Sequence, residues 1–180
     1  MNTVLNPAVN VEVQYAMSAH RVELTPSFDA FFRAEYPGLV AVASALAGSI
    51  DDAEDLVQDT MVKALLRWDR VSRLHRPGGW CHHVLINACR SWFRRRRTRS
   101  QWMARQRRAE PSSAGPSTET LVFWSAVRQL PERPRMAVAL FYAGEHTIAE
   151  IADILKAPEG TIRSDLTRSR VFLANQIGMN

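Results

Sequence analysis

Apolar residues recur at helical spacing between residues 53 and 68, and this pattern restricts the fold more than any other. Intervals of three and four residues place these side chains on one face of an α-helix. The chain shows no sustained alternation with a period of two and no Asn-Gly or Asp-Gly pair that would mark a hairpin turn. The sequence therefore predicts an all-α fold. The inward stripe consists of Ala53, Leu56, Val57, Thr60, Met61, Ala64, Leu65 and Trp68.

Capping residues place a helix before this one. Ser27 or Asp29 is expected to begin a helix whose aromatic stripe packs in the core and which ends near Gly48. Ser49 and the aspartates after it supply capping groups for the helix with the long stripe. The two helices are therefore expected to follow one another directly.

A third helix is expected to begin at Trp80, after Gly78 and Gly79 interrupt the pattern. Its inward stripe contains both cysteines of the chain, which a helix would place ~12 Å apart, beyond the reach of a disulfide. We expect both cysteines to be reduced and half-buried. The stripe consists of Cys81, Val84, Leu85, Ala88, Cys89 and Trp92.

A stretch rich in proline, serine and glycine at residues 109–120 separates two helical halves. Such a composition is typical of a flexible connection, so we expect two small helical domains joined by a flexible linker. The apolar share of 46% is enough for a buried core. The N-terminal extension is either disordered or folds on a regulator. The expected division is an extension at 1–24, a first domain at 25–98, a linker at 99–118 and a second domain at 119–180.

Charge is distributed unevenly along the chain. A net charge of +5 favours a polyanionic partner. Residues 51–59 hold five carboxylates and no basic side chain, whereas residues 90–108 hold nine arginines and no acidic side chain. No apolar run approaches the ~20 residues that span a bilayer, and the first residues do not resemble a secretory signal. The expected location is the cytoplasm.

Two helical faces outside the apolar stripes carry side chains that a core does not need. Arginines neutralise phosphates, an amide reads a base edge, and an indole stacks on an exposed base for ~1–3 kcal/mol. A solvated basic face is the alternative interpretation of the arginines. The acidic face consists of Asp55, Gln58, Asp59 and Val62. The strand-binding face consists of Trp80, His83, Asn87, Arg90, Ser91, Arg94, Arg95, Arg96 and Arg97.

Residues 146–170 form the pattern of two short helices around a tight turn. Thr147 is expected to cap the first helix, and Pro158 stands where a second helix can begin without losing a needed hydrogen bond. This arrangement is typical of a helix-turn-helix, whose second helix enters the major groove. The inward residues of that helix are Ile162, Leu166, Leu173 and Ile177. The outward residues, termed the recognition face, are Arg163, Ser164, Thr167 and Arg168.

In this order, "DDAEDLVQDTMVKAL", "GGWCHHVLINACRSWFRRRR", a Pro/Ser-rich connection and "LPERPRMAVALFYAGEHTIAEIADILKAPEGTIRSDLTRSR" resemble the extracytoplasmic-function sigma factors of the sigma-70 family. These are small bacterial initiation factors that carry only the second and fourth sigma regions. The resemblance covers about residues 28 to 177. Because it joins two motifs in the right order, it is more specific than either motif alone.

The resemblance implies a role for each face. The acidic face would dock on the β′ subunit of core RNA polymerase, and β is expected as a further partner. The strand-binding face would hold the single non-template strand of the −10 element, and the recognition face would read the −35 element in the duplex. The resemblance also implies an anti-sigma factor as partner, no catalytic activity, and no cofactor or metal.

Three positions depart from the family pattern. His83 stands where an arginine or another basic residue is usual, and Cys81 replaces a common leucine. Asp165 follows "RS" where a second basic residue is typical. Facing DNA, Asp165 would repel phosphate or accept a hydrogen bond from cytosine N4. The expected −35 preference therefore depends on where Asp165 lies.

Other classes of protein account for parts of the pattern. A helix-turn-helix regulator that acts without core polymerase would use the second half but would leave the acidic face unexplained. A nuclease would hold Mg²⁺ on Asp51, Asp55 and Asp59, although magnesium sites usually draw carboxylates from converging elements. A metal site at Cys81, His82, His83 and Cys89 lacks a Cys/His pair at the i, i+4 spacing that brings two ligands to one ion.

Overall fold

The computed structural model describes the backbone of residues 27–103 and 118–177 and the side chains of residues 27–96 and 120–177. All regular secondary structure within these ranges is helical, which confirms the predicted all-α class. The N-terminal extension and residues 104–117 of the expected linker lie outside the described residues.

Four helices form the part of the first module that the structure describes. Ser27 begins the first of them, because its hydroxyl accepts a hydrogen bond from the Ala30 amide, and Ser49 caps the second through the Asp52 amide. Gly48 ends the first helix in the left-handed conformation, with φ 74°, which costs glycine little. The helices are α2 (Phe28–Ala47), α3 (Ile50–Leu65), α4 (Trp68–Val71) and α5 (Pro77–Met103).

Two details of this module correct the sequence prediction. Leu65, expected to face inward, is 52% exposed, because α3 ends there and the chain turns before Trp68 begins α4. Gly78 and Gly79 do not interrupt α5 but lie in its first turn. At Gly78, a Cβ would displace the Glu35 carboxylate of α2, so the glycine allows a close approach between the two helices.

The predicted inward stripe of α3 is otherwise confirmed, since its residues from Ala53 to Ala64 are buried. Cys81 and Cys89 are free thiols, as expected, but they are fully buried and not half-buried. Burial raises the pKa of each thiol to about 12, so both stay protonated at neutral pH.

Between residues 118 and 177 the second module also has four helices. Thr147 and Glu150 form a reciprocal capping box at the start of α8, which confirms the predicted cap. Pro158 is the N-cap of α9, and the turn before it places Lys156 in the left-handed conformation. The helices are α6 (Thr118–Val127), α7 (Glu132–Tyr142), α8 (Ile148–Leu155) and α9 (Glu159–Gln176).

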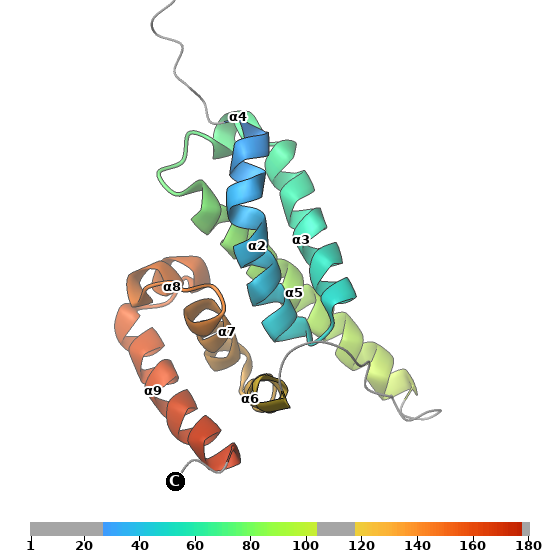
Figure 1. Ribbon diagram of the computed structural model, residues 1–180, viewed down its shortest axis with the longest axis vertical. Coiled ribbons are helices and arrows are strands. Elements are labelled where there is room, and N and C mark those ends of the chain that lie inside the picture. Colours follow the sequence, from blue (N-terminus) through green and yellow to red (C-terminus); the bar gives the residue numbers. More distant parts are fainter. Residues whose placement is uncertain (1–26, 104–117, 178–180) are drawn as a thin grey trace, which may run out of the picture.

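The two modules pack against each other along one boundary, termed the seam. Helix α8 lies against α5, and α7 lies against α2, as Figure 1 shows. At Gly144, after α7, a Cβ would lie 2.8 Å from Cγ2 of Val42 in α2, so the backbone of one module touches a side chain of the other. The buried side chains of both modules form one continuous core.

Candidate nucleic-acid and protein interfaces

The acidic face lies on the solvent side of α3. Asp55, Gln58 and Asp59 are exposed, and Val62 is 53% exposed. Leu65 and Leu66 extend this face with apolar surface, at 52% and 76% exposure. The sequence pattern missed this extension because it continued the inward stripe past the end of the helix. The enlarged face combines a carboxylate cluster with an apolar rim, which suits a basic protein partner better than a nucleic acid.

The first half of the strand-binding face lies in the seam. Trp80 is half-buried and packs on the core. His83 contacts the main-chain carbonyl of Ile154 in α8, with 2.8 Å between Nδ1 and the oxygen. Arg90 forms an ion pair with Glu132 at the start of α7, with 3.0 Å between Nε and Oε1. The predicted face is thus assembled on one side of α5, but its first turns are in contact with the second module.

The second half of this face continues along α5 toward solvent. Arg94 donates a hydrogen bond to the Ser91 hydroxyl at 3.1 Å, and Arg95 is exposed. Arg96 lies 4.9 Å from the Trp92 ring centroid and 3.8 Å from an Asp52 oxygen. All three arginines are exposed, and their positive charge attracts phosphates. The side chain of Arg97 lies beyond the described side chains.

The recognition face is exposed along the first turns of α9, as the pattern predicts. The Ser164 hydroxyl donates to the Gly160 carbonyl at 2.8 Å, and the Thr167 hydroxyl donates to the Arg163 carbonyl at 2.9 Å. Because both protons bond within the helix, each hydroxyl presents its acceptor lone pairs outward. Arg163 and Arg168 extend beside them, so the face offers both cationic donors and neutral acceptors to a DNA groove.

Asp165 does not belong to the recognition face. Its side chain is 5% exposed and forms an ion pair with Arg133 of α7, with Oδ2 2.7 Å from Nε and Oδ1 3.4 Å from Nη2. These hydrogen bonds raise the pKa of Arg133. Asp165 therefore does not face DNA in this structure, so neither repulsion of phosphate nor hydrogen bonding to cytosine N4 applies. The pair instead ties α7 to α9.

Two histidines meet in the seam without any sequence signal. The rings of His82 and His146 lie edge to face, with centroids 4.3 Å apart. Glu150 lies beside them and pairs with Arg76 of the first module at 3.6 Å. Hydrogen bonds from Thr147 lower the pKa of Glu150, so it stays ionised. No interval along the chain brings these four residues together, because 64 positions separate the two histidines.

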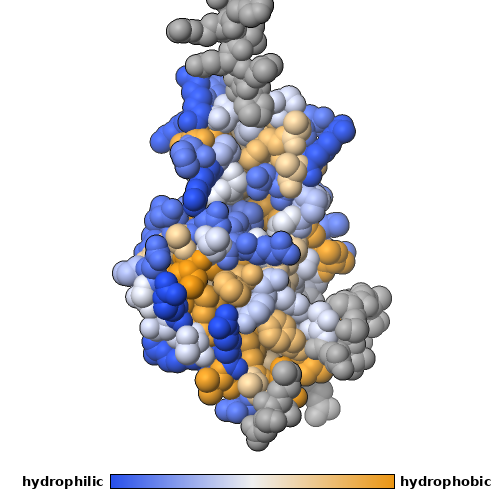
Figure 2. Space-filling view, turned by 60° about the vertical axis from the view of Figure 1, so that its left-hand side comes forward, coloured by the Kyte–Doolittle hydropathy of each residue, from blue (hydrophilic) through white to orange (hydrophobic). Residues whose placement is uncertain are grey.

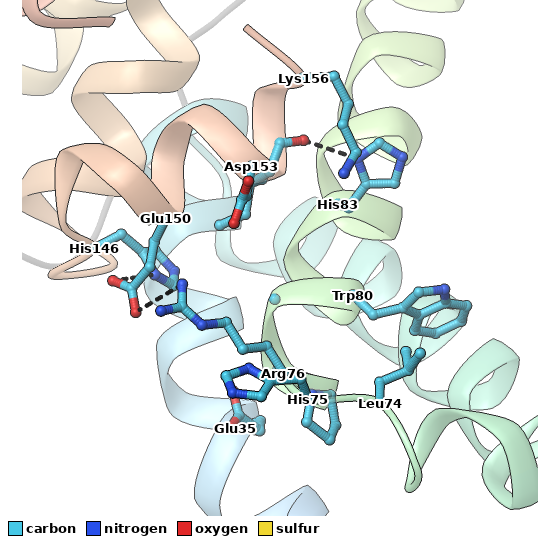
Figure 3. A pocket seen from close by; sticks show the side chains of 14 residues that line it. Glu35, Leu74, His75, Arg76, Trp80, His83, His146, Glu150, Asp153 and Lys156 are labelled. Carbon is cyan, nitrogen blue, oxygen red and sulfur yellow. Dashed lines mark hydrogen bonds and ion pairs between the residues drawn. The ribbon is translucent and has the colours of Figure 1, made fainter. Parts of the chain in front are cut away.

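A pocket of about 680 Å³ opens beside this cluster, between the two modules (Figure 3). Its first wall comes from α2 and the start of α5, and includes Glu35 and Trp80. Its second wall comes from α8 and the turn after it, and includes Asp153 and Lys156. The lining carries both signs of charge, and Figure 3 shows Lys156 reaching toward His83 across the boundary.

The second module also exposes apolar side chains. Leu121 and Val122 of α6 are 50% and 47% exposed, and Val171 of α9 is 61% exposed. Figure 2 shows apolar surface on the lower part of the molecule, where the second module lies. Exposed apolar surface of this kind is typical of contacts with another protein.

Within the described ranges, no three His, Cys, Asp or Glu side chains converge to hold a metal ion. Asp51, Asp55 and Asp59, the candidate ligands of a nuclease, are exposed along one edge of α3. His82 and His83 engage different carbonyl groups, those of Gly78 and Ile154. Across those same ranges, no helix has both the length and the apolar content to cross a membrane.

Two family models match the chain along most of its described length. The model of Sigma-70 region 2 matches residues 31–99, and the model of Sigma-70, region 4 matches residues 120–173. The first match covers the acidic face and almost the whole of α5. The second covers the helix-turn-helix and the recognition face.

Individual proteins agree with these matches. The chain is 31% identical over 155 residues to the ECF RNA polymerase sigma factor EcfG of Rhodopseudomonas palustris, which covers 84% of this chain and 85% of that protein. It is 27% identical over 173 residues to the ECF RNA polymerase sigma factor SigM of Mycobacterium tuberculosis, with 90% and 83% covered. The structure of the sigma factor RpoE of Bartonella quintana, solved in complex with the anti-sigma factor NepR, superimposes with a TM-score of 0.70 at 26% identity. That alignment covers 85% of this chain and 98% of the other.

Proposed function

We infer the role of each face from the family of the protein. The chain belongs to the sigma-70 family of RNA polymerase sigma factors, in its extracytoplasmic-function group. As such it binds core RNA polymerase and directs promoter recognition. It is a transcription initiation factor and not an enzyme. The assignment of individual residues to these tasks is the proposal developed below.

The acidic face is proposed to dock on the β′ subunit of core polymerase. Asp55, Gln58 and Asp59 are exposed and lie away from the seam, so they remain available whichever position the second module takes. Leu65 and Leu66 supply apolar area beside the carboxylates. A charged cluster with an apolar rim gives both orientation and affinity on a basic partner surface.

The strand-binding face is proposed to hold the non-template strand of the melted −10 element. Unstacking a base costs a few kcal/mol, and a factor that hydrolyses no ATP recovers this cost through stacking and phosphate contacts. Trp80 offers the aromatic surface, Asn87 the amide, and the arginines from Arg94 onward the positive charge. These contacts would keep the −10 element open.

The recognition face is proposed to read the −35 element as duplex. This face carries the residue assignment, because its four polar side chains are exposed near the start of α9 while Ile162, Asp165 and Leu166 on the other side of the same turns are buried. Each well-formed base contact would discriminate between promoters by ~1–3 kcal/mol. Because the two faces bind one DNA molecule at two separate elements, the spacing between the elements also contributes to the choice of promoter.

Partners and location follow from this role. RpoE of Bartonella quintana was solved with an anti-sigma factor, and we propose that this chain also has one, for which the exposed apolar residues of α6 and α9 are the natural contact. The proposed location is the cytoplasm, where core polymerase acts on the chromosome. The β subunit is proposed as a further contact of the second module.

Run-off transcription tests the proposed function. The full chain and core RNA polymerase are combined on a library of promoter fragments, and the transcribed fragments are sequenced. Enrichment of two sequence elements at fixed spacing is the expected result. Absence of any chain-dependent transcript would contradict the role in initiation.

A further inference from the structure

Three residues of the strand-binding face form a chain of hydrogen bonds that is anchored in the second module at both ends. His83 donates from Nδ1 to the Ile154 carbonyl at 2.8 Å and accepts at Nε2 from the Asn87 amide at 3.1 Å. Arg90 donates to the Asn87 carbonyl oxygen at 3.1 Å and to Glu132 at 3.0 Å. The four bonds link α8 to α7 through one side of α5.

The anchor at α8 has a physical cause. Ile154 lies in the last turn of α8, where a carbonyl has no partner within the helix and carries the negative end of the helix dipole. His83 satisfies this carbonyl, and that bond selects the imidazole tautomer with its proton on Nδ1. Since Nε2 is then an acceptor, Asn87 turns its amide donor toward it.

A single DNA strand would require the same groups. The Asn87 amide would face a base edge, and the Arg90 guanidinium would face a phosphate, yet both are engaged in the chain of bonds. Trp80, the proposed stacking surface, is half-buried at the pocket between the modules. The recognition face on α9, in contrast, stays exposed in the same structure.

Contacts outside the strand-binding residues strengthen the seam. The Arg135 guanidinium of α7 lies 4.1 Å from the centroid of the Phe93 ring of α5, and Arg76 pairs with Glu150. Burial lowers the pKa of Arg135, which indicates how closely the two modules enclose it. The seam is therefore a packed interface within the chain and not a single polar contact.

We propose that the strand-binding face is also the docking site for the second module, so that the closed chain masks its own −10 contacts while leaving its −35 contacts exposed. This rests on the proposed function of the strand-binding face. Opening of the seam must then precede capture of the single strand, because α8 and Glu132 occupy the groups that the strand needs. A closed chain would bind duplex DNA through α9 and would bind single strands poorly.

The test changes the second module and leaves the strand-binding residues intact. Glu132→Lys places a cation against Arg90, whereas Glu145→Lys makes the same charge change at an exposed residue of the same module for which no contact across the seam is found. Spin labels at Arg70→Cys and Asn175→Cys report the distance between modules by electron–electron resonance. The buried native cysteines stay unlabelled in the folded chain.

We expect E132K to broaden the distance distribution, and E145K to keep the single distance of the unaltered chain. Affinity for a fluorescent random-sequence single-stranded 12-mer, measured by anisotropy, should rise for E132K at least about threefold above E145K, because a larger fraction of chains is open. Duplex affinity should be equal in the two variants. E132Q only removes the charge, so it should change the distance distribution and the single-strand affinity in the same direction as E132K but by less.

Equal distances and equal single-strand affinities in E132K and E145K would overturn the proposal. An opened seam without a gain in single-strand affinity would overturn it as well, because the masking would then have no effect. Circular dichroism melts confirm that each variant folds, and E132Q carries the same test should E132K fail to fold. Run-off transcription by the unaltered chain separates these outcomes from a failure of the proposed function itself.

Discussion

His82 of α5 and His146, between α7 and α8, meet edge to face across the seam, with ring centroids 4.3 Å apart and planes at 83°. His82 is 4% exposed and donates from Nδ1 to the Gly78 carbonyl at 3.1 Å. Burial is the largest cause that lowers the pKa of His82 to about 4, and the neighbouring His146 contributes to the same shift. Both rings are therefore neutral at pH 7, and the seam contains a pair that resists protonation.

Acid should weaken the folded, closed chain. An unburied histidine has a pKa near 6.5, and the pKa of His82 lies below it, so its contribution to stability is fully present above pH 6.5 and is lost as the pH falls toward 4. The shift corresponds to about 3 kcal/mol for His82. Glu150, which lies beside the pair and contacts Arg76, stays ionised in this window because its pKa is lowered. Thermal melts between pH 7.5 and 4.5 measure the effect.

His82→Phe provides the control for this titration. It keeps an aromatic ring edge against His146 but carries no ionisable group, so the melting temperature should depend less on pH than in the unaltered chain. An unchanged pH dependence would mean that other groups cause the loss in acid. His75, an exposed histidine at the edge of the pocket, offers a matched substitution that should leave the pH dependence intact.

Reversing charge on the acidic face should weaken binding to core polymerase. Asp59→Lys with Gln58→Ala removes a carboxylate and an amide and adds a cation where a basic partner surface is expected. We expect a loss of at least about tenfold in affinity, or ~1.4 kcal/mol. Glu54→Lys is the matched control, since Glu54 is exposed on α3 beside the face but not part of it. Surface plasmon resonance on immobilised core enzyme distinguishes them.

Removing Arg163 should relax the choice of the −35 element without affecting core binding. Its side chain is exposed on α9 and is part of the recognition face. Arg163→Ala is expected to cost ~1–3 kcal/mol at the preferred base and little elsewhere in the promoter. Run-off transcription from a library randomised upstream measures the change. An unaltered preference there would exclude Arg163 from base recognition.

The Asp165–Arg133 pair should stabilise the second module without contacting DNA. Asp165→Asn keeps the shape of the side chain but weakens two hydrogen bonds, so the melting temperature should fall by several degrees while the −35 preference stays the same. Melting curves and the promoter library separate the two effects. A changed base preference would show that Asp165 acts on DNA after all.

Both cysteines should be unreactive in the folded chain. Cys81 and Cys89 are buried, and burial raises the pKa of each to about 12, so little thiolate is present at neutral pH. Titration with a thiol reagent is expected to label neither in native buffer and both in guanidinium chloride. Rapid labelling of the native chain would indicate that the first module opens readily.

The sequence was sufficient for features that depend on one or two helical turns. Ser27, Ser49 and Thr147 cap helices through amides three residues away, so the starts of α2, α3 and α8 were predictable from local spacing. The exposed sides of α3 and α9 were predictable for the same reason, because periodicity alone separates the two sides of a helix. The predictions for Leu65 and Gly78 were wrong. Leu65 is exposed because α3 ends there, and Gly78 lies inside α5, where the Glu35 side chain of α2 approaches it closely.

Only the tertiary structure decided what each polar side chain meets. Asp165 is buried because Arg133 of α7, which is 32 positions away in the sequence, pairs with it. Arg90 is likewise paired because Glu132 lies across the seam. His82 and His146 meet because α5 and the turn before α8 are packed together. A charged or polar group enters an interior only when a partner satisfies it there, and that partner is chosen by packing between distant segments, which no local pattern in the chain encodes.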